Sequence, residues 1–265
     1  MADADELLRA GDLQGARAAL IETVKRAPTD QSARLYLFQL LCLQGDWDKA
    51  LTHLRTLASL SAEAQMLSVN YAMAIEAERS RIEVFAGRAQ PVLLVGSSAW
   101  AGDLAAAIGE LAQGRLDEAL ARREQAFDAA PDTPGEFGEQ RFDWISDSDP
   151  RFGPSLEAII AGRWGLVPFD AIERIESEGP RDLRDLVWLP AVVAFKSGQS
   201  VNALLPTRYP GTEASDDDTL KLARATIWQD EPGGPFGLGQ HEWSLSDGSE
   251  VSLLALRRLT FDGAA

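Results

Sequence analysis

Residues 11–16 read Gly-Asp-Leu-Gln-Gly-Ala, and residues 45–50 echo them as Gly-Asp-Trp-Asp-Lys-Ala. The two stretches start 34 residues apart, which is the period of tetratricopeptide-type helical hairpins. A third copy, Gly-Arg-Leu-Asp-Glu-Ala at 114–119, starts 69 residues after the second, within one residue of two further periods. The echo predicts that the chain opens as a module of helix–turn–helix units.

The glycine and alanine of the echo, and a proline further along, have physical roles in such a hairpin. The glycine ends the first helix. The position after a helix often adopts a left-handed backbone conformation, which is energetically unfavourable for residues other than glycine. The alanines at 16, 50 and 119 let two helices approach closely, and the prolines at 28 and 131 stop the second helix. Stacked hairpins usually leave a concave groove suited to a peptide or a helix. A helical bundle that serves only as a scaffold is the alternative.

Composition bounds the remaining possibilities. The 265 residues, 45% of them hydrophobic, suggest two domains, which we place at 1–130 and 131–265. A net charge of −16 argues against nucleic acid or anionic membrane as a partner and favours basic or neutral proteins, although solubility alone also explains it. The chain lacks an apolar run of about 18 residues and starts with acidic residues, so we expect a cytoplasmic protein. The lone Cys42 reads as a small core residue.

Apolar residues three and four apart predict helices over the first 130 residues, with glycine or proline between them. The expected ranges are 3–10, 14–27, 31–43, 46–60, 62 to about 85, 103–113 and 115–130. In the long helix from residue 62, the apolar residues Met66, Val69 and Met73 give way to Glu78 and Arg81. This change is typical of a helix that leaves the core.

After Pro131, short apolar runs replace the long periodic ones. Residues 154–161 predict a short helix that Gly162 closes. Strands are expected at 164–169, 186–195, 201–205, 226–229, 242–245 and 251–259, and the Asp-Gly pair at 247–248 predicts a hairpin between the last two. The fold class is therefore α+β: tetratricopeptide-like hairpins followed by a smaller β-rich, barrel-like domain. Five tryptophans are expected to form its core: Trp144, Trp164, Trp188, Trp228 and Trp243.

Several short polar segments are candidates for binding sites. The aspartates at 216–218 predict a solvated loop in which Asp218 caps a short helix, and the glycine-rich stretch 233–239 lacks the Lys-Ser or Lys-Thr of a phosphate loop. Asp147-x-Asp149 begins like a calcium loop, but Phe152 stands where glycine is required. His53 has no second ligand at metal spacing. The loop from Arg208 to Gly211 suits either recognition or a fixed internal salt bridge.

Four stretches together resemble the ImpE family, also called TagJ or SciE. They are Trp-Ile-Ser-Asp-Ser-Asp at 144–149, Arg-Phe-Gly-Pro-Ser-Leu-Glu-Ala at 151–158, Asp-Leu-Arg-Asp-Leu-Val-Trp-Leu-Pro-Ala at 182–191 and Leu-Pro-Thr-Arg-Tyr-Pro-Gly at 205–211. The resemblance runs over nearly the whole chain. It implies a cytosolic accessory protein of bacterial type VI secretion systems, with a helical half before a β-containing half and without catalytic residues.

The resemblance also implies a partner, the N-terminal segment of the small contractile-sheath subunit, TssB, and a link to sheath turnover by the ClpV ATPase. It does not say which residues make the contact, so the partner-binding residues remain unknown. We expect no enzyme, no cofactor and no catalytic, cofactor-binding or metal site. The alternative is a small-ligand-binding protein or an enzyme that uses the region of Asp147 and Arg208.

Overall fold

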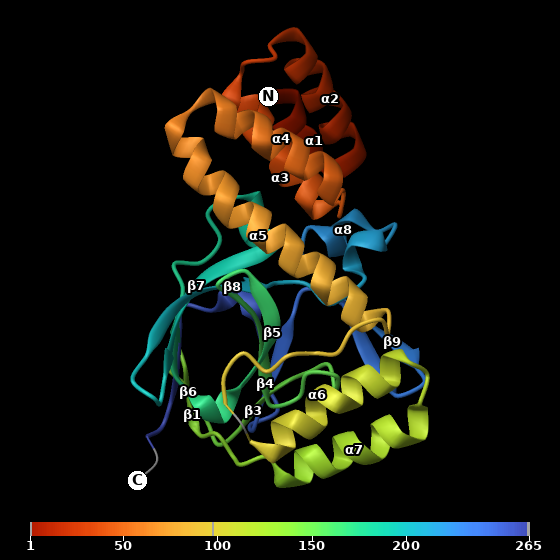
Figure 1. The fold of residues 1–265 in the computed structure, drawn as a ribbon, viewed down its shortest axis with the longest axis vertical. Coiled ribbons are helices and arrows are strands. Elements are labelled where there is room, and N and C mark those ends of the chain that lie inside the picture. Colours follow the sequence, from red (N-terminus) through yellow and green to blue (C-terminus); the bar gives the residue numbers. More distant parts are fainter. Residues whose placement is uncertain (1, 97, 264–265) are drawn as a thin grey trace.

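The helices come first along the chain and the sheets follow (Figure 1), in a computed structural model that describes residues 2–96 and 98–263. The helices before the first strand are α1 (Ala2–Arg9), α2 (Leu13–Arg26), α3 (Gln31–Leu43), α4 (Trp47–Leu60), α5 (Ala62–Phe85), α6 (Ala99–Ala112) and α7 (Leu116–Ala129). In the part of the chain that the structure describes, no helix is both long and apolar enough to cross a membrane.

The echo marks the turns of three helical hairpins, as predicted. Gly11, Gly45 and Gly114 lie between the two helices of each hairpin, with φ of +85°, +68° and +76°. The alanine five residues after each glycine is buried. The third hairpin, α6–α7, lies beside the sheets at the far end of α5 from α1–α4 (Figure 1). The repeat therefore continues in the sequence, although α5 separates the third hairpin from the first two.

The sheets are antiparallel throughout. The eight-stranded sheet runs in the order β2-β1-β13-β6-β7-β8-β4-β5, and it is accompanied by a three-stranded sheet, β12-β11-β3, and a two-stranded one, β10-β9. The strands are β1 (Gly135–Phe137), β2 (Gln140–Phe142), β3 (Ile145–Asp147), β4 (Ser155–Ile160), β5 (Arg163–Pro168), β6 (Ile172–Glu176), β7 (Trp188–Phe195), β8 (Ser200–Pro206), β9 (Thr226–Glu231), β10 (Gly234–Gly239), β11 (Glu242–Leu245), β12 (Glu250–Ser252) and β13 (Arg258–Phe261). Together they make the barrel-like half seen in Figure 1.

The predicted helix at 154–161 is wrong, because these residues form β4 between β5 and β8. Leu156 and Ala158 pack into the core of the barrel, whereas Ile159 packs in the cluster that includes α5. Both faces of β4 are thus covered, and the alternation of apolar and polar residues that marks a half-exposed strand is missing. A short continuous apolar run of this kind does not distinguish strand from helix.

Further differences concern element ends and short strands. Helix α6 begins at Ala99, before the expected start at residue 103, and the expected strand 251–259 divides into β12, a 3₁₀ turn and β13. The glycine-rich stretch at 233–239 largely becomes β10, and four other short strands, β1, β2, β3 and β6, were not predicted. Asp217, not Asp218, caps the short helix α8 (Asp218–Lys221). The predicted hairpin between β11 and β12 is confirmed.

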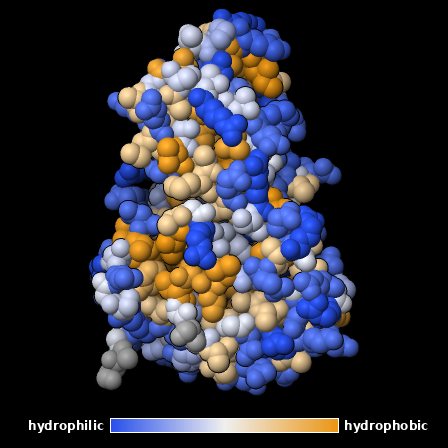
Figure 2. Space-filling model, viewed as in Figure 1, coloured by the Kyte–Doolittle hydropathy of each residue, from blue (hydrophilic) through white to orange (hydrophobic). Residues whose placement is uncertain are grey.

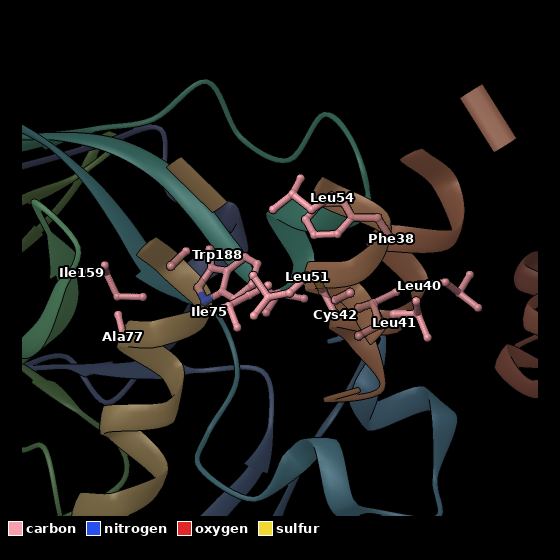
Figure 3. Close-up of a cluster of buried hydrophobic side chains, with 14 of the residues drawn as sticks. Phe38, Leu40, Leu41, Cys42, Leu51, Leu54, Ile75, Ala77, Ile159 and Trp188 are labelled. Atoms are coloured by element: carbon pink, nitrogen blue, oxygen red, sulfur yellow. The ribbon is translucent and has the colours of Figure 1, made fainter. Parts of the chain in front are cut away.

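One hydrophobic cluster runs from the helical hairpins through α5 to the barrel. Figure 3 shows Trp188 of β7 beside Ile75 of α5, with Ala77 and Ile159 on one side and residues of α3 and α4 on the other. Cys42 is buried within this cluster, as predicted, and burial raises the pKa of its thiol. Of the five tryptophans expected in the core, Trp144 and Trp228 are exposed instead. They lie on a loop and on β9, where the barrel does not cover them.

The C-terminal half of α5 contradicts the expected exit from the core. Glu78 and Arg81 are each only 5% exposed, whereas the apolar residues Met66, Val69 and Met73 of the N-terminal half are exposed. The polar half is buried because it lies against the barrel, where partners from the sheets bind its charges. The helix therefore enters the second half of the molecule where the sequence suggested that it leaves the core.

Candidate functional site

Asp147 and Arg208, the pair singled out for a possible enzyme, have different binding partners. Arg208 Nη1 donates to the backbone oxygens of Leu43 and Lys221, both at 2.8 Å. Asp147 accepts from the Tyr209 hydroxyl at 2.9 Å and lies 2.8 Å from His241 Nδ1. Arg208 therefore holds helices and barrel together as a fixed internal element. The two side chains do not converge on a shared reaction site, and the geometry gives no support to the enzyme alternative.

A buried carboxylate, Glu157 on β4, is the centre of a polar network between α5 and the barrel. Arg81 donates to both of its oxygens, from Nε at 2.5 Å and from Nη2 at 2.7 Å. The indole N–H of Trp164 donates to it at 2.6 Å, and His241 Nε2 lies 3.1 Å from Oε2. The fold reaches this arrangement by placing Glu157 on the face of β4 that is turned to α5.

A second carboxylate, Glu78, extends the network along α5. The indole N–H of Trp188 donates to Glu78 at 2.8 Å, and Arg81 Nη1 lies 3.5 Å from it. Arg81 Nη2 also donates to the backbone oxygen of Arg208 at 2.8 Å. The guanidinium of Arg81 thus contacts α5, β4 and the loop after β8 at once.

A neighbouring branch fixes the hairpin formed by β9 and β10. Asp149 accepts the backbone N–H of Gly237 on β10 at 2.8 Å and forms an ion pair with Arg151 at 2.6 Å. The Arg151 guanidinium also lies 4.4 Å from the centre of the Phe236 ring, a cation–π contact. The acidic cluster that resembled the start of a calcium loop therefore organises loops by hydrogen bonds and ion pairs.

The charges in this network stabilise one another. Burial lowers the pKa of His241, but the carboxylates of Asp147 and Glu157 outweigh burial and raise it to about 9. Burial raises the pKa of Glu157, but Arg81 and His241 outweigh it and hold it at about 2. The raised pKa of His241 favours its imidazolium form, which lies between the carboxyl groups of Asp147 and Glu157, whereas burial raises the pKa of Asp147. An ion network with this many hydrogen bonds fixes the orientation of the groups that it joins.

Sequence reasoning found only part of this network. Asp147, Asp149 and Arg208 were singled out, but Arg81, Glu157 and His241 were not. Arg81 and Glu157 are 76 residues apart, and His241 and Glu157 are 84 residues apart. The one local signal was a Glu78 and Arg81 pair on a helix that is otherwise rich in apolar residues.

A groove of about 560 Å³ lies between α5 and the outer face of β4, β7 and β8. Its lining is mainly apolar and includes Met73 and Ala74 of α5, Ile159 of β4, Ala191 and Val192 of β7 and Leu204 of β8. Met73 is 42% exposed and Val192 is 41% exposed. The network on the next turns of α5 joins this helix to β4 through Glu157 and to β7 through Trp188.

An apolar stripe on α5 continues the groove toward the helical hairpins. Met66, Val69 and Met73 are three and four residues apart, so they lie on one face of the helix. Met66 is 69% exposed and Val69 is 56% exposed. Figure 2 shows hydrophobic patches on this side of the molecule, over α5 and over the barrel. Exposed contiguous apolar surface of this kind marks interaction sites in soluble proteins.

Charged groups border the barrel side of the groove. Glu176 at the end of β6 and Glu178 just after it belong to its lining. Each is paired with an arginine, Glu176 with Arg174 at 3.1 Å and Glu178 with Arg181 at 3.0 Å. This edge of the groove therefore carries charges of both signs. The concave surface expected between stacked hairpins is a different one, because one wall of this groove is the barrel and not a second hairpin.

Comparison with known proteins identifies relatives for both halves. A family model described as ImpE protein matches residues 139–260, and a tetratricopeptide repeat model matches residues 7–69. TagJ of Pseudomonas aeruginosa, named as a type VI secretion system accessory component, is 43% identical over 259 residues, covering 98% of this chain and 91% of that protein. The crystal structure of a Vibrio parahaemolyticus protein has a TM-score of 0.87 at 23% identity and covers 98% of both chains. At that identity the likeness shows the fold alone.

Proposed function

The chain belongs to the ImpE family, and on that premise we propose that it is a non-enzymatic accessory component of a type VI secretion system. In this role it binds the N-terminal segment of the small contractile-sheath subunit, TssB. The relative from Pseudomonas aeruginosa, matched over nearly the whole of both chains, supports the secretion assignment. The same proposal links the protein to sheath turnover by the ClpV ATPase, either directly or through the bound subunit.

The groove between α5 and the barrel is the observation that carries this proposal. An amphipathic helix binds such a groove with apolar side chains at positions i, i+3 or i+4, and i+7. The stripe from Met66 to Met73 has this spacing and extends about 10 Å along α5 at 1.5 Å per residue. Two to three turns of a bound helix would cover the stripe and the groove together. Methionine side chains adapt well to such a surface, because they are flexible and polarizable.

Charge sets the expected chemistry of the bound segment. The whole chain carries a net charge of −16. We expect basic residues at the edges of the bound helix, which would speed its association. This electrostatic contribution weakens as salt rises, while the apolar contact persists. A segment that folds on binding loses entropy, so the expected affinity is modest, on the order of micromolar.

Co-purification tests the partner. The full-length sheath subunit should be recovered with this protein, and a form without its first residues, about 25 and so several helical turns, should not. Equal recovery of both forms would show that the contact lies elsewhere on the sheath subunit. Recovery of neither would remove the sheath subunit as the partner.

A groove variant tests the surface separately. Val69→Asp puts a charge on the apolar stripe and should weaken binding of the 25-residue peptide at least tenfold, since about 1.4 kcal/mol corresponds to a factor of ten. Leu120→Asp is the matched control, because Leu120 is a partly exposed apolar residue on α7. If both variants bind the peptide like the wild type, the partner uses another face of the molecule.

A further inference from the structure

The strand β9 has an open edge. The two-stranded sheet contains only β10 and β9, and every residue of β9 from Thr226 to Glu231 is partly or fully exposed. Ile227 is 45% exposed and Trp228 is 38% exposed, so large apolar side chains lie on an edge that natural proteins usually protect. This edge is not part of the groove, whose walls are α5 and β4, β7 and β8.

The hydrogen-bond register shows which backbone groups face outward. The N–H of Gln240 donates to the oxygen of Ala225 at 3.1 Å, in the same register as the pairs that join β9 to β10. In an antiparallel pair, alternate residues exchange hydrogen bonds with the neighbouring strand. Ile227 and Gln229 therefore pair with β10, and the N–H and C=O groups of Thr226, Trp228 and Asp230 point away from it.

We propose that two copies of this chain associate by antiparallel pairing of their β9 strands. A two-fold axis at Ile227 would place Thr226 of one copy opposite Trp228 of the second. Both residues direct their backbone groups outward, so each copy would supply the donors and acceptors that the other needs. The pairing would extend two separate hairpins into one four-stranded sheet with an isologous interface.

In this register, charged residues near the two ends of β9 are complementary between the two copies. Arg224 precedes β9 and is exposed, and Asp230 lies near the other end of the strand and is exposed as well. In the antiparallel pair each Arg224 would face Asp230 of the second copy. The Arg224 guanidinium lies 3.2 Å from the oxygen of Leu8 and 3.5 Å from that of Arg9. These contacts are long and exposed, so the side chain can turn to a carboxylate.

The interface is small, and each copy carries a net charge of −16. One six-residue strand per copy buries less than the roughly 1,200 Å² typical of stable complexes. We therefore expect a weak, concentration-dependent dimer. An extended peptide from another protein could use the same edge, but the self-complementary charges favour a second copy.

Sedimentation equilibrium over a range on the order of 10 to 500 µM tests the proposal. The average mass should rise from 28.7 kDa toward twice that value. Asp230→Pro removes an outward N–H while the ladder to β10 keeps its bonds, and it should abolish the rise. Asp230→Ala is the matched control for the N–H, since it loses only the charge and should keep part of the association.

Charge reversal tests the register. Arg224→Asp and Asp230→Arg should each suppress the dimer, and the double variant should restore it, because the two residues would face each other between copies. A thermal melt confirms that each variant is folded. A wild type that stays at 28.7 kDa at every concentration overturns the proposal. A dimer that Asp230→Pro leaves unchanged, or that the double variant does not restore, overturns the proposed pairing.

Discussion

The two halves of α5 invert the usual relation between polarity and burial. The N-terminal half carries Met66, Val69 and Met73 on its exposed face, whereas the C-terminal half buries Glu78 and Arg81 against the barrel. Apolar residues are normally inside and charged residues outside. Each exception here has a distinct physical cause. The buried charges have partners within the chain, and the exposed apolar residues lie where a partner from outside can cover them.

The buried charges in the C-terminal half of α5 contribute more to the orientation of this helix on the barrel than to the stability of the fold. A buried ion pair gains little over a well-packed apolar pair, because both charges lose their water. Hydrogen bonds have strict directions, however, and Arg81 satisfies Glu157, Glu78 and the backbone of Arg208 together. As a hypothesis, this network sets the angle at which α5 crosses the barrel and so shapes the groove. Hydrophobic packing alone would allow neighbouring angles at similar cost.

Among the variants that compare the two halves of α5, Arg81→Met should lower the free energy of unfolding most. The variant leaves Glu157 buried with His241 and Trp164 but without its bidentate partner, and breaking a buried pair in this way costs about 3–5 kcal/mol. Denaturant unfolding measures the loss. Arg79→Met is the matched control two residues away, because Arg79 forms ion pairs with Glu76 and Asp48 at the surface. The control should cost about 0–1 kcal/mol. Equal losses for both variants would show that the network contributes no more than a surface pair.

The pH dependence of the unfolding free energy should show the contribution of protonated His241. Its pKa is about 9 in the folded protein against an ordinary value of 6.5, so protonation stabilises the folded state. This contribution is fully present below pH 6.5 and is lost as the pH rises through 9, by about 3 kcal/mol at about 1.4 per pKa unit.

The measurement is a series of denaturant melts from pH 6 to pH 10, compared with His241→Asn. The difference in unfolding free energy between wild type and variant should shrink across this window, because the asparagine does not titrate. A difference that stays constant would mean that His241 has the same charge in both states throughout. At the acid end, Glu157 has a pKa of about 2 against 4.5, so its contribution is present above pH 4.5 and is lost as the pH falls through 2.

The helical half could be predicted closely from the sequence because its signals are local. Gly11, Gly45 and Gly114 fix each turn by a left-handed backbone, and the helices between them follow from apolar spacing. The barrel could be predicted less well from the sequence. Its strand β4, which lies between β8 and β5 in the large sheet, is covered on both faces and therefore shows no alternation.

The buried network could not be predicted, for a different reason. Arg81, Glu157 and His241 are ordinary charged residues at three distant positions, and only the packing of α5 on the barrel brings them together. The recognisable motifs contributed Asp147 and Arg208, but their sequence context does not show that one binds a histidine and the other backbone oxygens. The groove was missed as well, because one wall comes from the helix and the other from three strands.

Substitutions in the exposed apolar stripe should change the unfolding free energy least, and a buried residue of the same helix provides the comparison. Met66→Ser and Val69→Ser remove apolar groups that are already in water, so the unfolding free energy should change by less than about 0.5 kcal/mol. Ile75→Ser, on the same helix and fully buried, should lose several times more, about 2 kcal/mol or above, because a hydroxyl replaces packed methyl groups. Binding of the sheath peptide should show the opposite order, with the two stripe variants weakened although their melts match the wild type. If Met66→Ser and Val69→Ser destabilise the free protein as much as Ile75→Ser does, the stripe is already covered within the chain in solution, and the groove is not an open site.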